Sequence, residues 1–494
     1  MFKNLLMVKP IEAQPHVDAG EPVEGSLEGE ATLQRTLTGT QLIMLGIGAV
    51  IGAGIFVLTG QAAAEYAGPA VMLSFVFAGI ACAFAGLCYA EFAAMLPVSG
   101  SAYSYSYATL GEGVAWFIGW CLILEYLFAA STVAVGWSGY LNAFLSNFHL
   151  ALPATLASAP YTYEASTAQF VGTGALINLP AVLIIAALSG VSYVGITQSA
   201  LVNSVVVAIK VTVILLFIAF GIKYVDPANW HPFIPANEGG TKYGMEGVIR
   251  ASAVVFFAYI GFDAVSTAAG EAKNPQRDMP IGILGSLAIC TVLYMAMSAV
   301  LTGMMDFRLL GTPEPVSTAL NNYPTLGWLQ TLVELAAIAG LSSVILVMLM
   351  AQPRIFYSMA RDGLLPTMFG KVHPRFHTPY MGTIIVGVIA AILAGLLPVG
   401  FLGDIVSMGT LLAFAVVSAG VLILRFTRPD LHRPFRVPMA IVICPLGVVS
   451  CLYLFWQPFK EHWHLLLGWV VIGALIYAVY GYRNSKLRKQ SPAA

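Results

Sequence analysis

A lysine stands in the middle of an apolar run long enough to cross a bilayer. Lys210 lies within LVNSVVVAIKVTVILLFIAF, a run with no other charged residue. A charged lysine at that depth is costly, so it must face protein or water and either titrate or form a pair. The alternative is a side chain that extends to the membrane interface, which its central position disfavours. Because burial disfavours the charged form of a lysine, Lys210 could exchange protons.

Acidic residues interrupt three other apolar runs. Glu125 lies in WCLILEYLFAAS, Asp263 in FFAYIGFDAVS and Glu334 in LQTLVELAAIAG. Each could take part in proton transfer, or form a structural pair with Lys210, a polar side chain or water, and both interpretations stay open. Glu91 stands at the inner end of its run, where we expect a structural or gating role.

The stretch IMLGIGAVIGAGIFV at 43–57 is rich in glycine, the residue that disfavours helix most after proline. One interpretation is a packing face, since Gly48 and Gly52 form a GxxxG motif. The other is a discontinuous helix that unwinds at Gly52, Ala53 and Gly54, where amide N–H groups face an anion and carbonyls face a cation. Unpaired backbone of this kind is tolerated in a bilayer only where it lines a cavity.

A second interruption occurs in AVVFFAYIGFDAVSTAAGE. Gly261 and Asp263 divide a run that is otherwise aromatic and β-branched. A discontinuous helix in one half of a transporter predicts a partner at the corresponding place in the other half. The spacing of the two interruptions fits an inverted repeat of spans one to five and six to ten.

The composition is that of an integral membrane protein. Of the 494 residues, 58% are hydrophobic and only 10% are charged, which lies far from the average soluble domain. The six cysteines all lie in apolar runs, so we interpret them as core residues and not as metal ligands. Apolar runs of about 20 residues, the length of a membrane-spanning helix, predict an all-α polytopic protein with twelve spans: 42–58, 71–96, 114–144, 177–194, 201–222, 248–268, 281–304, 326–350, 381–397, 401–424, 441–455 and 465–480.

The distribution of basic residues predicts the orientation. With the N-terminus inside, 17 of the 23 Lys and Arg residues fall on the inner side and five on the outer side, which favours two cytosolic termini. The remaining one is Lys210. The expected organisation is a cytosolic tail at 1–36, spans one to five at 37–222, an extracellular loop at 223–246, spans six to ten at 247–424, spans eleven and twelve at 425–480, and a cytosolic tail at 481–494.

Four stretches carry a family resemblance: IGAGIFVLTG, CYAEFAAMLPVSGSAYSYSYATLGE, FFAYIGFDAVSTAAGEAKNPQRDMPIGI and QPRIFYSMARDGLLP. They closely resemble the cationic amino acid transporter family of the amino acid-polyamine-organocation superfamily, in a bacterial member. The resemblance implies a five-plus-five inverted repeat with broken helices one and six and two additional C-terminal helices. It also implies secondary transport of amino acids across the plasma membrane by alternating access.

The resemblance also implies a substrate site. In that family the carboxylate of the amino acid contacts main-chain amides of the first break, and its ammonium group contacts carbonyls of the sixth span. Many relatives carry Ser or Thr inside the glycine pair where this chain has Ala53, so the backbone must bind the carboxylate without that hydroxyl. The positions implied are Val50, Gly52, Ala53 and Gly54 in the first break, and Phe257, Ala258 and Ile260 in the sixth span, with Phe257 as a gate.

The resemblance assigns the coupling ion to the proton. Lys210 resembles a lysine that, in proton-coupled relatives, takes the place of the sodium ion of sodium-coupled members. Glu125 and Asp263 match acidic positions that serve the proton route or the cation-facing wall. We therefore expect proton coupling through these three residues, with no metal and no cofactor.

The wall of the substrate pocket is expected on span eight, in AAIAGLSSVILVMLM. Ser342 and Ser343 are its polar residues and are predicted to contact substrate. Because a guanidinium would need an acidic partner there, small neutral amino acids such as alanine are favoured over cationic ones. An arginine or lysine transporter or exchanger is the alternative, and a non-transporting sensor is the alternative of another class.

The remaining expectations concern partners and location. A clustered catalytic set is missing from the sequence, which argues against an enzyme. The lipid bilayer of the cell (inner) membrane is the expected surrounding, with no nucleic acid as partner. A small accessory subunit stays open as a further partner.

Overall fold

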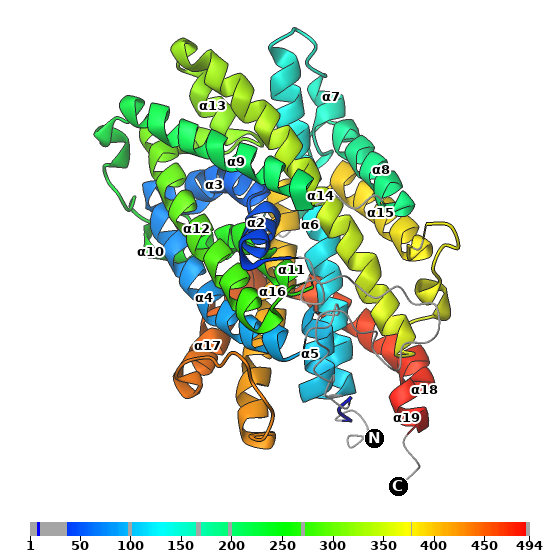
Figure 1. Cartoon of the computed structure of the whole chain (residues 1–494). Coiled ribbons are helices and arrows are strands. Elements are labelled where there is room, and N and C mark those ends of the chain that lie inside the picture. Colours follow the sequence, from blue (N-terminus) through cyan, green and yellow to red (C-terminus); the bar gives the residue numbers. More distant parts are fainter. Residues whose placement is uncertain are drawn as a thin grey trace.

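The computed structural model describes residues 7–9, 37–96, 101–164, 169–195, 200–267, 272–376 and 378–490. Helices dominate this part of the chain (Figure 1), as predicted. Its two strands, β1 (Tyr161–Glu164) and β2 (Gln169–Gly172), form an antiparallel hairpin in which Tyr161 pairs with Gly172. The fold is thus the expected all-α fold with one small β-hairpin between the third and fourth spans.

The first five predicted spans all lie on helix. The first is interrupted, and the others are continuous within the described residues. Their bounds are α2 (Gly39–Val50), η1 (Gly54–Leu58), α3 (Thr59–Ala62) and η2 (Ala63–Ala67) for span one, then η3 (Gly68–Ala70) and α4 (Val71–Met95), α6 (Glu112–Ser146), α8 (Leu179–Val194) and α9 (Ala200–Gly221), with α5 (Ser101–Thr109) and α7 (Ala154–Ala157) between spans.

Spans six to ten repeat this order, again with an interruption in the first member. The connecting segments carry further short helices, including η4 (Ile222–Tyr224) and α13 (Pro315–Asn321). The bounds are α10 (Gly244–Val255), η6 (Phe256–Tyr259) and α11 (Phe262–Thr267) for span six, then α12 (Pro275–Met304), α14 (Gly327–Arg361), α15 (Tyr380–Leu396) and α16 (Val399–Thr427).

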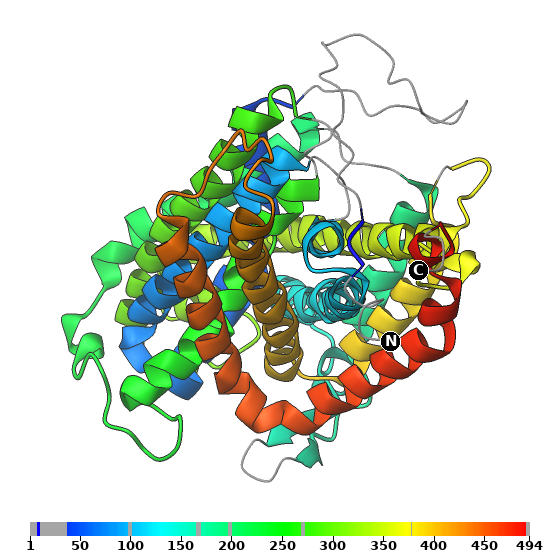
Figure 2. The same cartoon turned by 90° about the horizontal axis from the view of Figure 1, so that it is seen from below.

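Spans eleven and twelve form one long bent element, α17 (Ala440–Ile476), where the sequence predicted two helices with a gap. His462 has non-helical dihedrals (φ −120°, ψ 18°) inside this element. Pro458 lies one turn earlier and removes a backbone donor. The chain therefore reverses at a kink instead of a loop, and Figure 2 shows the change of direction. It continues through η11 (Tyr477–Gly481), α18 (Tyr482–Asn484) and α19 (Lys486–Gln490).

The apolar helices of the described part fall into two groups, those long enough to cross a bilayer and shorter ones. Seven helical stretches of the described part are long and apolar enough to cross a bilayer, and three apolar helices, α2, α8 and α15, are shorter. Two of the seven stretches take in more than one predicted run, namely Gly54–Met95 and Ala440–Lys489. Predicted span six is divided between α10 and α11 because its backbone is interrupted.

Both ends of the described chain lie on one face, which we call the proximal face (residues 7–9, α5 and α19); the opposite face, with α7 and α13, is the distal face (Figure 1). Glu112 binds the C-terminal segment there through Arg488 (2.8 Å) and Ser485. Its backbone N–H donates to the carbonyl of Met7 at 3.0 Å. Lys9 reaches the end of α14 through an ion pair with Asp362 at 2.8 Å. Residues 7–9 of the predicted tail are therefore bound to the helical body.

Glu91 has a structural role at the proximal face. Its carboxylate pairs with Arg425 at 2.6 Å and with Arg433 at 3.3 Å, and accepts from the backbone N–H of Val437 at 2.7 Å. These contacts join the end of α4 to the end of α16 and to the segment before α17.

Candidate substrate site

The first break lies where the glycines predict it. Helix α2 ends at Val50, Ile51 is extended (φ −73°, ψ 97°), and helical structure resumes at Gly54. The N–H groups that open the resumed helix have no partner within it. Carbonyls at the end of α2 are likewise released from helical pairing, and those of Gly48, Val50 and Ile51 accept hydrogen bonds from side chains instead.

The second break is made by Ile260 and Gly261. Ile260 is extended (φ −60°, ψ 134°) and Gly261 has a φ of +115°, a conformation that glycine adopts without strain. A Cβ on Gly261 would also lie 2.9 Å from the carbonyl carbon of Ala49. Glycine is therefore required here both for its backbone conformation and for the close approach of α2.

The two breaks touch each other through main-chain atoms. A Cβ added to Gly54 would overlap the Cα and Cβ of Ala258. Gly54 thus allows η1, which follows the first break, to pack closely against η6, which precedes the second break. The released amides of the first break and the released carbonyls of the second therefore come close together, as binding of a zwitterion requires.

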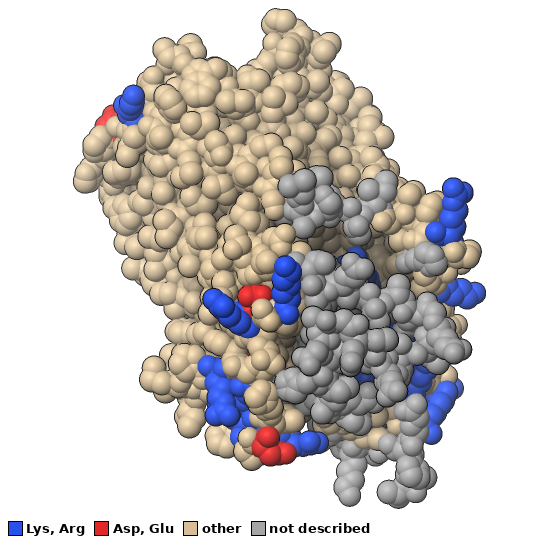
Figure 3. Space-filling view, in the orientation of Figure 1, with Lys and Arg blue, Asp and Glu red and all other residues tan. Residues whose placement is uncertain are grey.

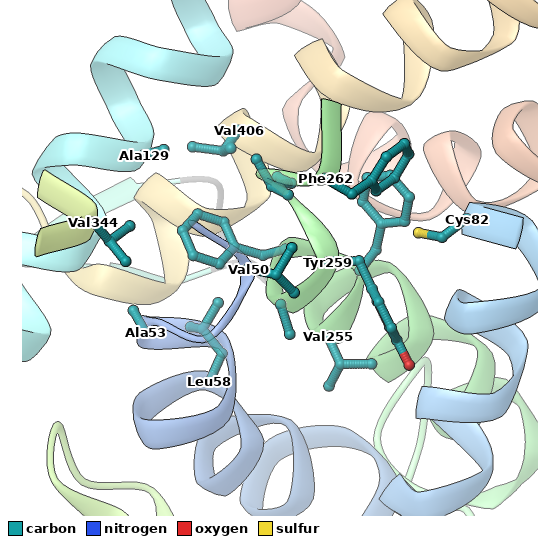
Figure 4. Close-up of a cluster of buried hydrophobic side chains, with 14 of the residues drawn as sticks. Val50, Ala53, Leu58, Cys82, Ala129, Val255, Tyr259, Phe262, Val344 and Val406 are labelled. Carbon is teal, nitrogen blue, oxygen red and sulfur yellow. The ribbon is translucent and has the colours of Figure 1, made fainter. Parts of the chain in front are cut away.

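A small cavity lies beside this contact, between the breaks, α6 and α14. Its free volume is about 10 Å³, which is about enough for one water molecule, so this conformation is closed around the site. Figure 4 shows Val50 and Ala53 of the first break with Ala129 of α6 and Val344 of α14 around this region. The lining is apolar throughout: Ala49, Val50, Gly52, Ala53, Gly54, Ala129, Val133, Phe257, Ile260, Val344 and Met348.

Most of the predicted substrate-binding residues meet at this cavity. Six of them line it, namely Val50, Gly52, Ala53, Gly54, Phe257 and Ile260. Ala258 lies behind them, against Gly54.

The two predicted serines of span eight do not line the cavity. Ser342 is half-buried and donates to the carbonyl of Ile338 in its own helix at 2.7 Å, and Ser343 lies outside the lining. The wall is made instead by Val344 and Met348, one turn apart on α14. A helix that is apolar on every side leaves its rotation undetermined by sequence pattern, so the polarity of the two serines does not place them on the cavity wall.

Lys210 holds the first break in place. It is fully buried, and its Nζ donates to the carbonyls of Gly48 and Ile51, each at 2.9 Å. Its stem packs on α14, where a Cβ on Gly340 would lie 2.7 Å from Cε. The partners of this lysine are thus main-chain carbonyls of the broken helix and not the carboxylates of Glu125 or Asp263.

The buried acids take different partners. Asp263 accepts from Tyr126 Oη at 2.6 Å and from the backbone N–H of Gly261 at 3.2 Å, so it stabilises the second break. Glu125 is fully buried, and neither of its carboxylate oxygens has a hydrogen-bond partner among the described residues. Thr410 of α16 lies close to Glu125, but its hydroxyl group donates to the carbonyl of Val406 at 3.1 Å.

Glu334 belongs to a separate cluster toward the distal face. Its carboxylate accepts from Ser317 at 2.6 Å, from Asn147 at 2.7 Å and from Gln330 at 3.0 Å. These contacts join α14 to α13 and to the end of α6, and they give Glu334 a structural role.

Tyr294 of α12 connects the two breaks, a role that the sequence did not indicate. Its hydroxyl lies 2.9 Å from the carbonyl oxygen of Val50 and 2.8 Å from that of Ala258. A tyrosine inside an apolar helix gives no sequence signal that distinguishes this role from core packing.

We expect Tyr294→Phe to lower transport about tenfold, because two buried carbonyls lose their shared donor, and each unsatisfied group costs about 1–3 kcal/mol. The measurement is the initial rate of uptake into proteoliposomes. Tyr323→Phe is the matched control, since Tyr323 Oη also lies against two carbonyls, those of Met304 at 2.6 Å and Tyr224 at 3.5 Å, but away from the breaks. Equal rates for the two variants would contradict a role for the bridge.

Two discontinuous helices whose unwound backbones meet beside an apolar cavity are typical of a transporter for a small solute. Consistent with this class, residues 37–480 match the family model described as amino acid permease. The chain belongs to this family, and it is therefore a multi-pass membrane transporter of amino acids and not an enzyme. The resemblance to the cationic amino acid transporter family is thereby confirmed.

The names of similar proteins refer to different substrates. The chain is 46% identical to the methylthioribose transporter of Bacillus subtilis over 458 residues, which cover 93% of this chain and 96% of that protein. It is also 46% identical to the branched-chain amino acid permease BcaP of the same organism over 466 residues, with the same coverage. Its identity to the vacuolar cationic amino acid transporter 4 of Arabidopsis thaliana is 39% over 404 residues, 82% of this chain and 65% of that protein.

Proposed function

We propose that the protein is a proton-coupled transporter of small neutral amino acids such as alanine, working by alternating access. The observation that supports proton coupling is the position of Lys210, whose ammonium group binds two carbonyls of the broken helix. Loss of its proton would turn two charge-assisted hydrogen bonds into weaker neutral ones, so protonation and the geometry of the first break are linked. Glu125, buried without a hydrogen-bond partner in the described chain, supplies a second place to hold a proton.

The apolar lining supports neutral substrates. A guanidinium or ammonium side chain would need an acidic partner, and the cavity is lined by apolar side chains and backbone alone. Branched-chain amino acids are the second candidate, because the permease BcaP, at 46% identity, carries that substrate in its name.

We further propose that the protein lies in the cell membrane with both termini in the cytosol. In Figure 3 the Lys and Arg side chains of the visible face gather at the proximal end, and a broad uncharged surface covers much of the remainder. This arrangement supports a proximal face on the cytosolic side. Bilayer lipid is the surrounding that such a surface requires.

The test is uptake of labelled alanine into proteoliposomes under imposed gradients. An inward proton gradient should drive accumulation that a protonophore abolishes, and an inward sodium gradient should not. Unlabelled leucine should compete less strongly than alanine, and arginine least. Accumulation driven by sodium alone would contradict proton coupling, competition led by arginine would contradict the substrate class, and binding without flux would indicate a sensor.

Met348 is the side chain that we expect to limit substrate size. Met348→Ala enlarges the wall formed by α14, so uptake of leucine relative to alanine should rise about tenfold, the effect of a few methylene groups in an apolar pocket. Val347→Ala, a truncation at the adjacent half-buried position outside the lining, is the control. The same ratio of rates in both variants would place the size limit elsewhere.

A further inference from the structure

A buried arginine binds two carboxylates on the distal side of the cavity. Arg250 of α10 is fully buried. Its Nη1 and Nη2 donate to the two oxygens of Asp404 at 3.1 and 2.6 Å. Its Nε and Nη2 donate to the two oxygens of Glu461 at 3.1 and 2.8 Å. The guanidinium is thus held in two forked contacts, the geometry in which arginine is most directional.

Arg250 also stands where the outer halves of both broken helices meet. Its guanidinium carbon lies 4.7 Å from the ring centre of Tyr66 in η2. One turn earlier, Gly247 packs against the carbonyl of Tyr66, where a Cβ would overlap that oxygen. The same carbonyl accepts from the backbone N–H of Tyr243 at 2.8 Å. The segment that carries Tyr66 and the segment that carries Arg250 are therefore packed as one unit.

The carboxylates belong to a different part of the molecule. Asp404 lies in the first turns of α16, and Glu461 lies at the kink of α17. His462 contacts Asp404 Oδ2 through Nε2 at 3.2 Å. The rings of Tyr163 and Phe401 pack on His462, with centroids 4.8 and 5.3 Å away. The kink, α16 and the β-hairpin thus form one receiving surface for Arg250.

We propose that Arg250 is the latch of a distal gate, which closes the outer halves of both broken helices against α16 and the kink of α17. Access to the cavity from the distal side requires these two parts to separate. The ion pairs hold the parts together while they are buried, and water solvates the separated charges once the gate opens. The latch therefore favours one of two states without preventing exchange between them. This proposal rests on the transporter class and not on the identity of the amino acid or the coupling ion.

The test measures access to the cavity from each side of the membrane. A cysteine introduced as Ala129→Cys lies in the cavity lining, and its reaction with a membrane-impermeant thiol reagent is followed by mass shift. The parent protein, whose six cysteines are all buried, gives the background. We expect Arg250→Gln to increase labelling from the distal side about tenfold or more and to decrease labelling from the proximal side, because the populations shift in opposite directions.

The matched control is Arg308→Gln. Arg308 also pairs with a carboxylate, that of Glu238 at 3.4 Å, but both side chains are about half exposed, at 52% and 43%. Its labelling should equal that of the parent. Unchanged labelling in Arg250→Gln would overturn the proposal, and so would an increase from both sides, which indicates a loosened fold.

A second variant covers the case in which Arg250→Gln does not fold. Glu461→Gln removes the charge of one of the two carboxylates that bind Arg250. Its side chain is the more exposed of the two, at 18%. Distal labelling should still rise and proximal labelling fall, each by about threefold. Parent-like labelling of this variant would overturn the latch.

Discussion

Lys210→Ala is expected to abolish accumulation of amino acid against a gradient and to lower the uptake rate about a hundredfold. The substitution leaves the carbonyls of Gly48 and Ile51 without their donor, and each buried acceptor left unsatisfied costs about 1–3 kcal/mol. It also removes the ammonium group that binds the first break. Uptake into proteoliposomes with and without an inward proton gradient measures both effects.

The control for this variant is Lys223→Ala. Lys223 follows α9 in η4 and is exposed, with its ammonium group 5.8 Å from the ring centre of Phe220. Its removal should leave both the rate and the proton dependence unchanged. A Lys210→Ala variant that still accumulates alanine when a proton gradient is applied would show that the coupling proton is carried elsewhere, with Glu125 as the next residue to replace.

Gly54→Ala should lower transport by a similar factor, about a hundredfold. The added methyl group would overlap the Cα and Cβ of Ala258, so the two breaks must move apart. Small-to-large changes in packed interiors cost about 1–3 kcal/mol, and here the displaced atoms belong to the backbone that we propose binds the solute. Uptake rate and alanine binding to purified protein are the measurements.

Gly468→Ala provides the matched comparison. Gly468 lies in α17, and a Cβ there would meet no atom of the described chain within 4 Å. Its variant should transport like the parent protein. If Gly54→Ala bound and transported alanine normally, the close contact between the breaks would have no role in the site.

The breaks could be predicted from sequence because closely spaced glycines interrupt the first run and a glycine beside an intramembrane acid interrupts the sixth. Gly52, Gly54 and Gly261 are found at or beside the unwound positions, and the family resemblance added Phe257 and Ile260. The bilayer restricts where backbone can be unpaired, so these few residues carry strong information about the fold.

The wall of the cavity could not be predicted in the same way. Helix α14 is apolar around most of its circumference, so its sequence does not say that Val344 and Met348 line the cavity while Ser342 bonds to its own helix. The same holds for Ala129 and Val133 of α6. The partners of Lys210 are main-chain carbonyls, which every residue possesses, and only the folded chain shows which carbonyls they are.

The kink in α17 is another feature that could not be predicted from the sequence. The polar segment around His462 resembles an ordinary loop between two spans, but it supplies Glu461 and His462 to a buried cluster with Arg250 and Asp404. Such a cluster joins residues that are far apart in sequence. Nothing in the local pattern around any one of them indicates the others.

The close contact between Gly54 and Ala258 has a consequence for how such a chain can change its solute over evolutionary time. The charged ends of an amino acid would be recognised by peptide groups, which no side-chain substitution removes, and the glycine between them has no room for a larger residue. Heritable variation in preference is thereby confined to the opposite wall, formed by Ala129, Val133, Val344 and Met348. A protein built in this way could therefore change its solute through that wall while its backbone framework stays the same.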